Sequence, residues 1–351
     1  MLFLGLIAFI ILTFVQPQEF VPGIKGLPLV YMTMAIVTFI WSWRTSVVKK
    51  TNFTKAPQNI MMILLCALIP LSTAKVSLFP EGFRAFVEWF KVIIIYFAMV
   101  SIIDNKNKLK TVIRIIVYSM AFTAVMGILQ NYGIDWTGQG AIDGRISGVG
   151  IFGTNQLAYA LVFCFPLAFA LILLSSSFID RLFTFTILLI YSYCLYLTQS
   201  RGGYLCLFLV LFISFFIFSR RRTVKLAGVA FCAFLFSAMV QFLPRFSSTF
   251  DYKTDRSAMG RLDVWGEALI ALKGSLIIGI GKDQFTEHFG FAPHSSYIQA
   301  AIELGIFGLF IWLALFYYSL KNLSRIDNDF RNGGTKDTLI ISKSLQISLY
   351  A

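Results

Sequence analysis

Charged residues are scarce in this sequence of 351 residues, where they make up 13% of the chain. A soluble domain carries roughly 25% charged residues, so the composition excludes a soluble globular protein. Hydrophobic residues account for 58% of the chain, and the mean hydropathy is +0.77. We therefore expect an all-α integral membrane protein, because a helix satisfies its own backbone hydrogen bonds in hydrocarbon.

Cysteine and histidine are also rare, and neither forms a pattern typical of a metal site. All five cysteines lie in apolar stretches without ligand-like spacing, so we interpret them as small buried residues. Asp251 and Asp255 are four residues apart beside two cations, which does not indicate a divalent-metal site. We expect no metal and no cofactor. The first apolar segment lacks a basic leader and a small-residue cleavage site, so no removable signal peptide is predicted.

Apolar segments long enough to cross about 30 Å of hydrocarbon recur along the whole chain. They predict a bundle of about 10–11 transmembrane helices. The ten full segments are 1–15, 27–43, 59–74, 84–103, 112–130, 156–174, 182–198, 203–219, 224–243 and 297–320. An eleventh apolar stretch, from Thr338 to Ala351, is too short to span; it is either part of a longer segment or lies at the membrane interface.

The net charge of +13 is not a nucleic-acid signal, because the basic residues fall on alternate loops. The positive set comprises the loops 44–57, 104–114, 220–225 and 321–336. The opposite set has a net charge of about zero. This pattern predicts a cytoplasmic N-terminus and an extracytoplasmic 244–296 loop.

The 53-residue segment from Pro244 to Ser296 gathers most of the polar chemistry of that face. It holds six basic and six acidic residues and both histidines of the chain, His288 and His294. We therefore divide the chain into N-terminal transmembrane helices, 1–130, and a catalytic region, 131–351.

Two short outer segments carry candidate anion-binding groups. Arg201 precedes Gly202 and Gly203 at the start of an apolar helix, whose N-terminal N–H groups suit an anion. The glycines allow another backbone or a ligand to approach closely. The alternative for Arg201 is a side chain that reaches up to the lipid headgroups.

The glycine-rich 131–155 loop carries Arg145 and ends at Thr154 and Asn155, either of which is a candidate helix cap. A loop of this kind is tolerated at membrane depth only where protein or a water-filled cavity satisfies its backbone. The alternative is an ordinary connecting loop.

Two further candidates lie in the long loop. Apolar residues at 262, 265, 269 and 272 predict an amphipathic helix at the outer interface, with Trp265 as its anchor and Arg261 in its first turn. His294 stands at the mouth of the last full segment. A solvated, non-functional histidine is the alternative there.

In chain order these motifs resemble the O-antigen ligase and polymerase superfamily. The matching segments are Gly144–Gly148 with Asn155, Ser200–Gly203, Arg261–Trp265, Gly279–Gly281, His294–Tyr297 and Glu303–Gly308. The resemblance covers roughly residues 110–320. It implies a polytopic glycosyltransferase of the bacterial inner (cytoplasmic) membrane, with an all-helical, GT-C-like fold and an active site on the periplasmic face.

The resemblance also implies the substrates and the roles of the site residues. The donor would be a glycan on undecaprenyl diphosphate, and the acceptor a glycan, lipid or protein hydroxyl. Arg201 and Arg261 would hold the diphosphate, and His294 would act on the acceptor hydroxyl in a metal-independent, inverting transfer. Substrate contacts would come from Arg145, Asn155, Gly202, Gly203 and Glu303. Lipopolysaccharide or another cell-envelope polysaccharide would be the product.

Three alternatives remain. A polymerase of lipid-linked repeat units uses the same donor class and differs in its acceptor. A transporter or flippase keeps ionisable groups near the bilayer midplane, whereas the spans here, beyond their first three residues, hold only Glu88, Lys91 and Glu303. Glu88 and Lys91 are spaced to pair with each other. A structural membrane-assembly protein would leave the outer arginines without a role.

Overall fold

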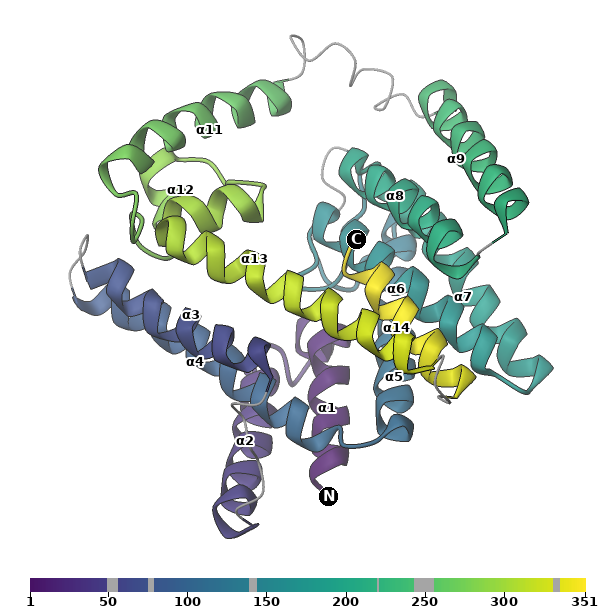
Figure 1. Ribbon diagram of the computed structural model, residues 1–351, viewed down its shortest axis with the longest axis horizontal. Helices are drawn as coiled ribbons and strands as arrows, with labels where there is room; N and C mark the ends of the chain where they lie inside the picture. Colours follow the sequence, from purple (N-terminus) through teal and green to yellow (C-terminus); the bar gives the residue numbers. More distant parts are fainter. Residues whose placement is uncertain (49–55, 75–78, 139–143, 220, 243–255, 331–334) are drawn as a thin grey trace. The chain divides into compact units, whose positions relative to one another are not determined.

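A computed structural model describes residues 1–48, 56–74, 79–138, 144–219, 221–242, 256–330 and 335–351. These residues form thirteen α-helices and one 3-10 helix, and no strand occurs among them (Figure 1). The helices are α1 Leu2–Val15, α2 Leu29–Val48, α3 Pro57–Ala74, α4 Phe79–Ile102, α5 Lys106–Asn131, α6 Thr154–Leu174, α7 Phe178–Thr198, α8 Arg201–Phe218, α9 Arg222–Phe242, α11 Arg256–Gly274, α12 Gln284–Phe289, α13 Ser296–Phe330 and α14 Lys336–Ser348, with the 3-10 helix η1 at Pro17–Glu19.

Each of the ten predicted spans coincides with a helix. Seven helices in the described part are long and apolar enough to cross a membrane: α3, α4, α5, α6, α7, α8 and α13. The fold is therefore a polytopic all-α membrane protein. α1 is apolar but has only 14 residues, so crossing by α1, α2 and α9 remains a prediction.

The chain forms two compact units, and each is described by itself. Unit 1 contains Met1–Trp43, Ile102–Ser247 and Asn322–Ala351, and unit 2 contains Arg44–Ser101 and Ser248–Lys321. Both units take segments from either side of residue 130. The functional division proposed at that residue stays a prediction.

The core of unit 1 is built around α6, which packs against α5, α7, α8 and α14. The α6 side chains Leu157, Leu161 and Ala168 are fully buried, as is Tyr191 of α7. Tyr191 donates its hydroxyl proton to the Val117 carbonyl of α5 at 2.6 Å, so its polar end is satisfied inside the core.

The C-terminal helix α14 packs into this core, and its location at the membrane interface stays a prediction. Its Ile341 and Ile347 belong to the buried cluster of unit 1. Its Ser348 hydroxyl donates to the Phe163 carbonyl of α6 at 2.9 Å, and Lys343 Nζ donates to the Ile217 carbonyl of α8 at 2.8 Å. Small hydroxyl residues allow α14 to approach its neighbours closely and to bond to their backbones.

The long helix α13 of unit 2 is broken at Gly305, where φ is 69° and ψ is −169°. The break leaves carbonyl oxygens of the preceding turn without a partner inside the helix. Ile280 N–H donates to the Ile302 carbonyl at 2.9 Å, and Gly281 N–H donates to the Glu303 carbonyl at 3.0 Å. The segment before α12 thus supplies the hydrogen bonds that the helix has lost.

The exchange also runs in the other direction, because Ile306 N–H donates to the Leu276 carbonyl at 2.9 Å. The two backbones lie so close that only glycine fits. A Cβ atom on Gly305 would overlap the Ile277 carbonyl, and one on Gly279 would overlap the backbone of α13. Both glycines also have positive φ angles, 69° and 74°, which side chains rarely tolerate.

We predict that Gly305→Ala and Gly279→Ala each lower the free energy of unfolding by at least about 2 kcal/mol, because each combines a strained backbone angle with overlap against backbone atoms. Unfolding in mixed micelles titrated with dodecyl sulfate measures the change. Gly266→Ala in α11 is the matched control, because open space surrounds that position. Equal stability of Gly305→Ala and the control would contradict the tight backbone exchange.

Candidate functional site

The turn between α7 and α8 sets the position of Arg201. Gln199 adopts the left-handed conformation with φ 47°, which ends α7. The Ser200 hydroxyl accepts from Gly203 N–H at 3.3 Å and caps α8. Arg201 is therefore the first residue of α8, at the positive end of the helix dipole. The predicted helix N-terminus beside this arginine is confirmed.

Arg145 lies beside this turn and ties three segments together. Its Nε donates to the Thr198 carbonyl at 2.8 Å, and its Nη2 donates to Asn155 Oδ1 at 3.0 Å. The Ser200 hydroxyl bonds to the same Asn155 oxygen at 3.0 Å. Unit 1 thus brings three predicted site residues, Arg145, Asn155 and Arg201, into neighbouring positions.

The expected cap at Thr154 or Asn155 is wrong. Gly153 holds the capping position of α6, and it makes no side-chain cap. The Asn155 oxygen is already used by Arg145 and Ser200, so it does not fold back onto its own helix.

Gly202 and Gly203 let α8 pack closely on α6. A Cβ atom on Gly202 would overlap the Tyr159 hydroxyl, and one on Gly203 would lie 2.7 Å from the Ala158 Cβ. The predicted close approach is therefore made by side chains of α6. Because the Gly203 N–H is bound to the Ser200 hydroxyl, what this pair offers a ligand is the Gly202 N–H at the start of α8.

The part of the glycine-rich loop at 146–149 is buried in unit 1, and the location of the loop at membrane depth stays a prediction. Ile146, Ser147 and Val149 are each 4% exposed or less. Two glutamines satisfy its backbone: Gln130 Oε1 accepts from Ser147 N–H at 3.2 Å, and Gln16 Nε2 donates to the Val149 carbonyl at 3.4 Å. The protein thus supplies the backbone partners that a buried loop needs.

In unit 2, α11 holds the turn that carries His294. The Trp265 indole N–H donates to the Pro293 carbonyl at 2.7 Å. Trp265 was expected to anchor α11 in the membrane interface, but its polar edge is used inside the unit. The helix itself, predicted over this segment, is confirmed.

The packed face of α11 differs from the predicted one. Val264, Ala268 and Leu272 pack against the small core of α12 and α13, with Ala268 fully buried. Leu262 and Leu269 are about half exposed, so they form a separate apolar stripe. Such a stripe suits the predicted location at the membrane surface, although three of the four residues that defined the predicted face do not carry the core.

His294 and Arg261 lie near each other. Partial burial lowers the pKa of His294 below its ordinary value, and the positive charge of Arg261 lowers that pKa further. The His294 backbone is left-handed, with φ 48°, and its ring lies 5.4 Å from the Phe291 ring. Arg261 Nε is buried without a hydrogen-bond partner. The structure thus places an imidazole with a lowered pKa near a cation that has an unused donor.

The other histidine lies in a different setting. His288 is in the last turn of α12, where its ring contacts the ring of Phe289. The backbone of His288 is helical, whereas that of His294 is left-handed.

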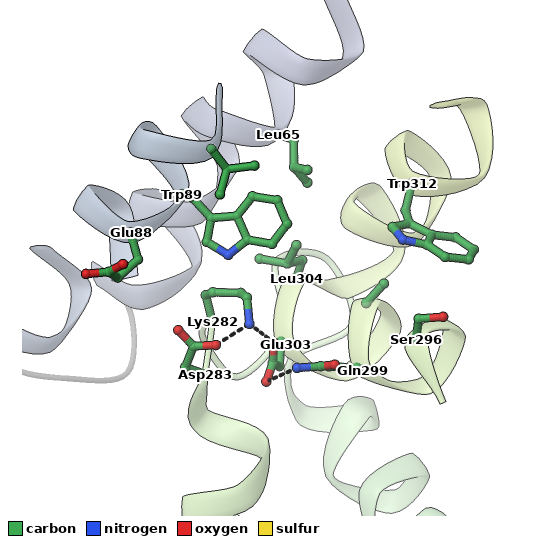
Figure 2. A pocket seen from close by; sticks show the side chains of 12 residues that line it. Leu65, Glu88, Trp89, Lys282, Asp283, Ser296, Gln299, Glu303, Leu304 and Trp312 are labelled. Atoms are coloured by element: carbon green, nitrogen blue, oxygen red, sulfur yellow. Dashed lines mark hydrogen bonds and ion pairs between the residues drawn. The ribbon is translucent and has the colours of Figure 1, made fainter. Parts of the chain in front are cut away.

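Unit 2 contains a cluster of charged side chains that the sequence analysis did not predict. Lys282 Nζ donates to Glu303 Oε2 at 2.8 Å and also pairs with Asp283, and Gln299 Nε2 donates to Glu303 Oε1 at 3.2 Å. Figure 2 shows these bonds as one connected network. Burial lowers the pKa of Lys282, but Glu303 and Asp283 outweigh it, so the pKa lies above its ordinary value. The available signal was two charges placed beside the glycines at 279, 281 and 305.

This network borders a cavity of about 530 Å³. Its walls come from α3, α4, α13 and the segment before α12. The lining residues include Trp89, Trp312, Glu88, Asp283, Ser296 and Gln299. The predicted Glu88–Lys91 pair is confirmed, with 2.6 Å between the charged atoms.

Residues 184–313 match the model of the O-antigen ligase family. This match confirms the resemblance to O-antigen ligases. No curated protein matches the chain in a sequence comparison. The O-antigen ligase segment contains Arg201, Arg261, His294 and Glu303, whereas Arg145 and Asn155 precede it. It also contains both halves of the Gly305 backbone exchange.

No group of three or more histidine, cysteine, aspartate or glutamate side chains that could hold a metal occurs in the described part of the chain. Metal-independent chemistry stays a prediction.

We predict that the measured pKa of His294 lies below 6.5 and rises in Arg261→Gln, because removal of the neighbouring cation makes protonation less costly. Arg261→Lys, which keeps the charge, should retain most of the depression. NMR titration of histidine-labelled protein resolves this directly, since the chain has only two histidines. His288 is the internal control. An unchanged His294 pKa in Arg261→Gln would contradict the proximity of Arg261 to His294.

Proposed function

We propose that this protein transfers a glycan from an undecaprenyl-diphosphate carrier to an acceptor hydroxyl on the outer face of the bacterial inner membrane, as a ligase does. The observation that carries the proposal is the O-antigen ligase match over residues 184–313, because it contains Arg201, Arg261 and His294. The match supports an enzyme of the ligase and polymerase class. The donor, the acceptor and the roles below are our proposal.

The arginines bind the donor diphosphate. Departure of a diphosphate from an anomeric carbon needs stabilisation of growing negative charge, and the guanidinium fork binds phosphate oxygens in pairs and stays charged. Arg201 starts α8, where backbone N–H groups add to the positive field. Arg261 has a buried Nε without a partner, which a phosphate oxygen would satisfy. Arg145 adds charge while it holds the turn before Arg201.

His294 is the general base. It accepts the proton of the acceptor hydroxyl, and the hydroxyl oxygen then bonds to the anomeric carbon of the donor sugar. The bond from that carbon to the phosphate oxygen breaks, and its electron pair leaves with the diphosphate. A single displacement of this kind inverts the anomeric carbon. The lowered pKa supports the role, because it favours the neutral imidazole, which is the form that accepts a proton.

The remaining predicted residues position this machinery. Asn155 Oδ1 accepts hydrogen bonds from the Arg145 guanidinium and the Ser200 hydroxyl, which fixes the turn before Arg201. The Glu303 carboxylate accepts a hydrogen bond from Lys282, and the Glu303 backbone carbonyl accepts one from Gly281 in the backbone pairing at Gly305. Both act on the site through other groups. The Gly202 backbone N–H at the start of α8 is offered to the anion, while Gly203 lets α8 pack closely on α6.

We predict that His294→Ala abolishes transfer but keeps donor binding, whereas Arg201→Lys weakens donor binding about tenfold. Loss of a positioned base costs about 10²–10⁴-fold in rate. Lysine keeps the charge but lacks the fork that binds phosphate oxygens in pairs. The measurements are retention of radiolabelled undecaprenyl diphosphate and transfer of radiolabelled lipid-linked glycan by purified protein.

The matched control is His288→Ala, which should transfer normally. Equal damage from both histidine variants would contradict the assignment of the base. The acceptor is tested in the same assay: label attached to a lipid core or protein supports a ligase, and elongated donor-linked glycan supports a polymerase. Movement of labelled lipid across the bilayer without transfer would instead indicate a flippase.

A further inference from the structure

The cavity beside the Lys282–Glu303 network has the composition of a small-molecule site. Its volume, about 530 Å³, falls within the range of roughly 300–1,000 Å³ seen for such sites. Six of its twelve lining residues are apolar or aromatic, and the other six are polar or charged. Residues of unit 2 alone form it, so the site is complete within that unit.

The charges that line the cavity disfavour a diphosphate. Asp283 and Glu303 contribute two carboxyl groups and Lys282 contributes one ammonium group, whereas the Glu88 carboxyl is paired with Lys91. That ammonium is already bound to Glu303 and Asp283. An anion entering here would meet net negative charge at short range, where Coulomb repulsion is poorly screened. The ligand is therefore uncharged or carries a positive charge.

The polar groups also disfavour a hydrocarbon chain. Glu303 is 2% exposed and Lys282 is 8% exposed, so their bonds are made in a region with little water. The side chain of Asp283 is about 59% exposed. An isoprenoid tail packed over Asp283 and Gln299 would remove water from them and return no hydrogen bonds, which is costly.

The aromatic residues indicate a ring-shaped ligand that has apolar faces and polar groups at its edge. Trp89 of α4 and Trp312 of α13 both line the cavity, and Figure 2 shows the connected network of Lys282, Asp283, Glu303 and Gln299 beside the Trp89 ring. An indole ring offers an apolar face with a negative quadrupole, on which the slightly positive C–H groups of a sugar ring stack. Carboxylate and amide oxygens accept hydrogen bonds from hydroxyl groups.

We propose that this cavity binds an uncharged sugar ring of the acceptor glycan, with Trp89 and Trp312 against its C–H faces and Asp283 and Gln299 at its hydroxyl groups. That the sugar belongs to the acceptor rests on the proposed function. Ser296 lines the cavity and lies two residues after His294, the base proposed for the acceptor hydroxyl. The donor diphosphate binds the arginines and is repelled here.

The test measures binding without catalysis. The full-length protein is placed in lipid nanodiscs and mixed with the oligosaccharides that mild acid releases from the host envelope. Saturation-transfer NMR then reports the sugar protons that contact protein. Trp89→Leu and Trp312→Leu should each weaken binding about fivefold, because each removes one stacking face and keeps an apolar side chain. Trp43→Leu is the matched control, since Trp43 is 69% exposed and lies outside the cavity.

A second variant covers the case in which a tryptophan variant fails to fold. Ser296→Phe adds volume at an exposed position of the lining and removes no core contact, so it should block the sugar while the thermal unfolding midpoint is kept. Retention of tritiated undecaprenyl phosphate in the same nanodiscs should be unchanged in all three cavity variants. Loss of that lipid with normal sugar binding would overturn the proposal and assign the cavity to the isoprenoid chain.

The outcome is separable from that of the proposed function. Sugar binding that depends on both tryptophans supports the subsite even if the protein transfers no glycan. Normal sugar binding by all three folded cavity variants overturns the subsite even if His294→Ala abolishes transfer.

Discussion

Backbone groups without partners are costly where water is absent, and unit 2 is organised around one place where this constraint is met between two segments. At Gly305 the helix α13 gives up its own hydrogen bonds, and the segment from 276 to 281 replaces them in both directions. This exchange fixes Lys282 directly after the paired segment and opposite Glu303. The charge pair, the cavity wall and the start of α12 all follow from it.

Unit 1 meets the same constraint with side chains. The 146–149 part of the loop before α6 is buried, and Gln16 and Gln130 take the place of a helical or strand partner for its backbone. Arg145 satisfies the Thr198 carbonyl where α7 ends, and Ser200 satisfies the first N–H groups of α8. Candidate functional residues and structural bonds are therefore the same groups here, and a substitution at Arg145 changes both.

The sequence predicted what depends on local properties. Helix positions follow from the length of apolar segments, and the Glu88–Lys91 pair follows from i,i+3 spacing within one helix. It did not predict Lys282 with Glu303, which are 21 residues apart and meet only because two backbones pair. Trp265 was assigned to the interface because a tryptophan on an amphipathic helix suits headgroups, but its partner Pro293 lies 28 residues away. The packing of α14 was not predicted because the tail was judged by its length alone, whereas its serine and lysine side chains bond to neighbouring helices.

The charge of Arg261 acts on both proposed substrates, because it binds the donor and affects the base that activates the acceptor. Arg261 binds the donor diphosphate in our proposal, and the same charge lowers the pKa of His294. A bound diphosphate would neutralise that charge and raise the pKa, so the imidazole would become a stronger base when the donor is in place. The histidine titration repeated with undecaprenyl diphosphate should therefore show a higher His294 pKa than the free protein, with His288 unchanged. An identical His294 pKa in both titrations would mean that the donor does not reach Arg261. Coupling of this kind would limit activation of the acceptor hydroxyl to molecules that already hold a donor.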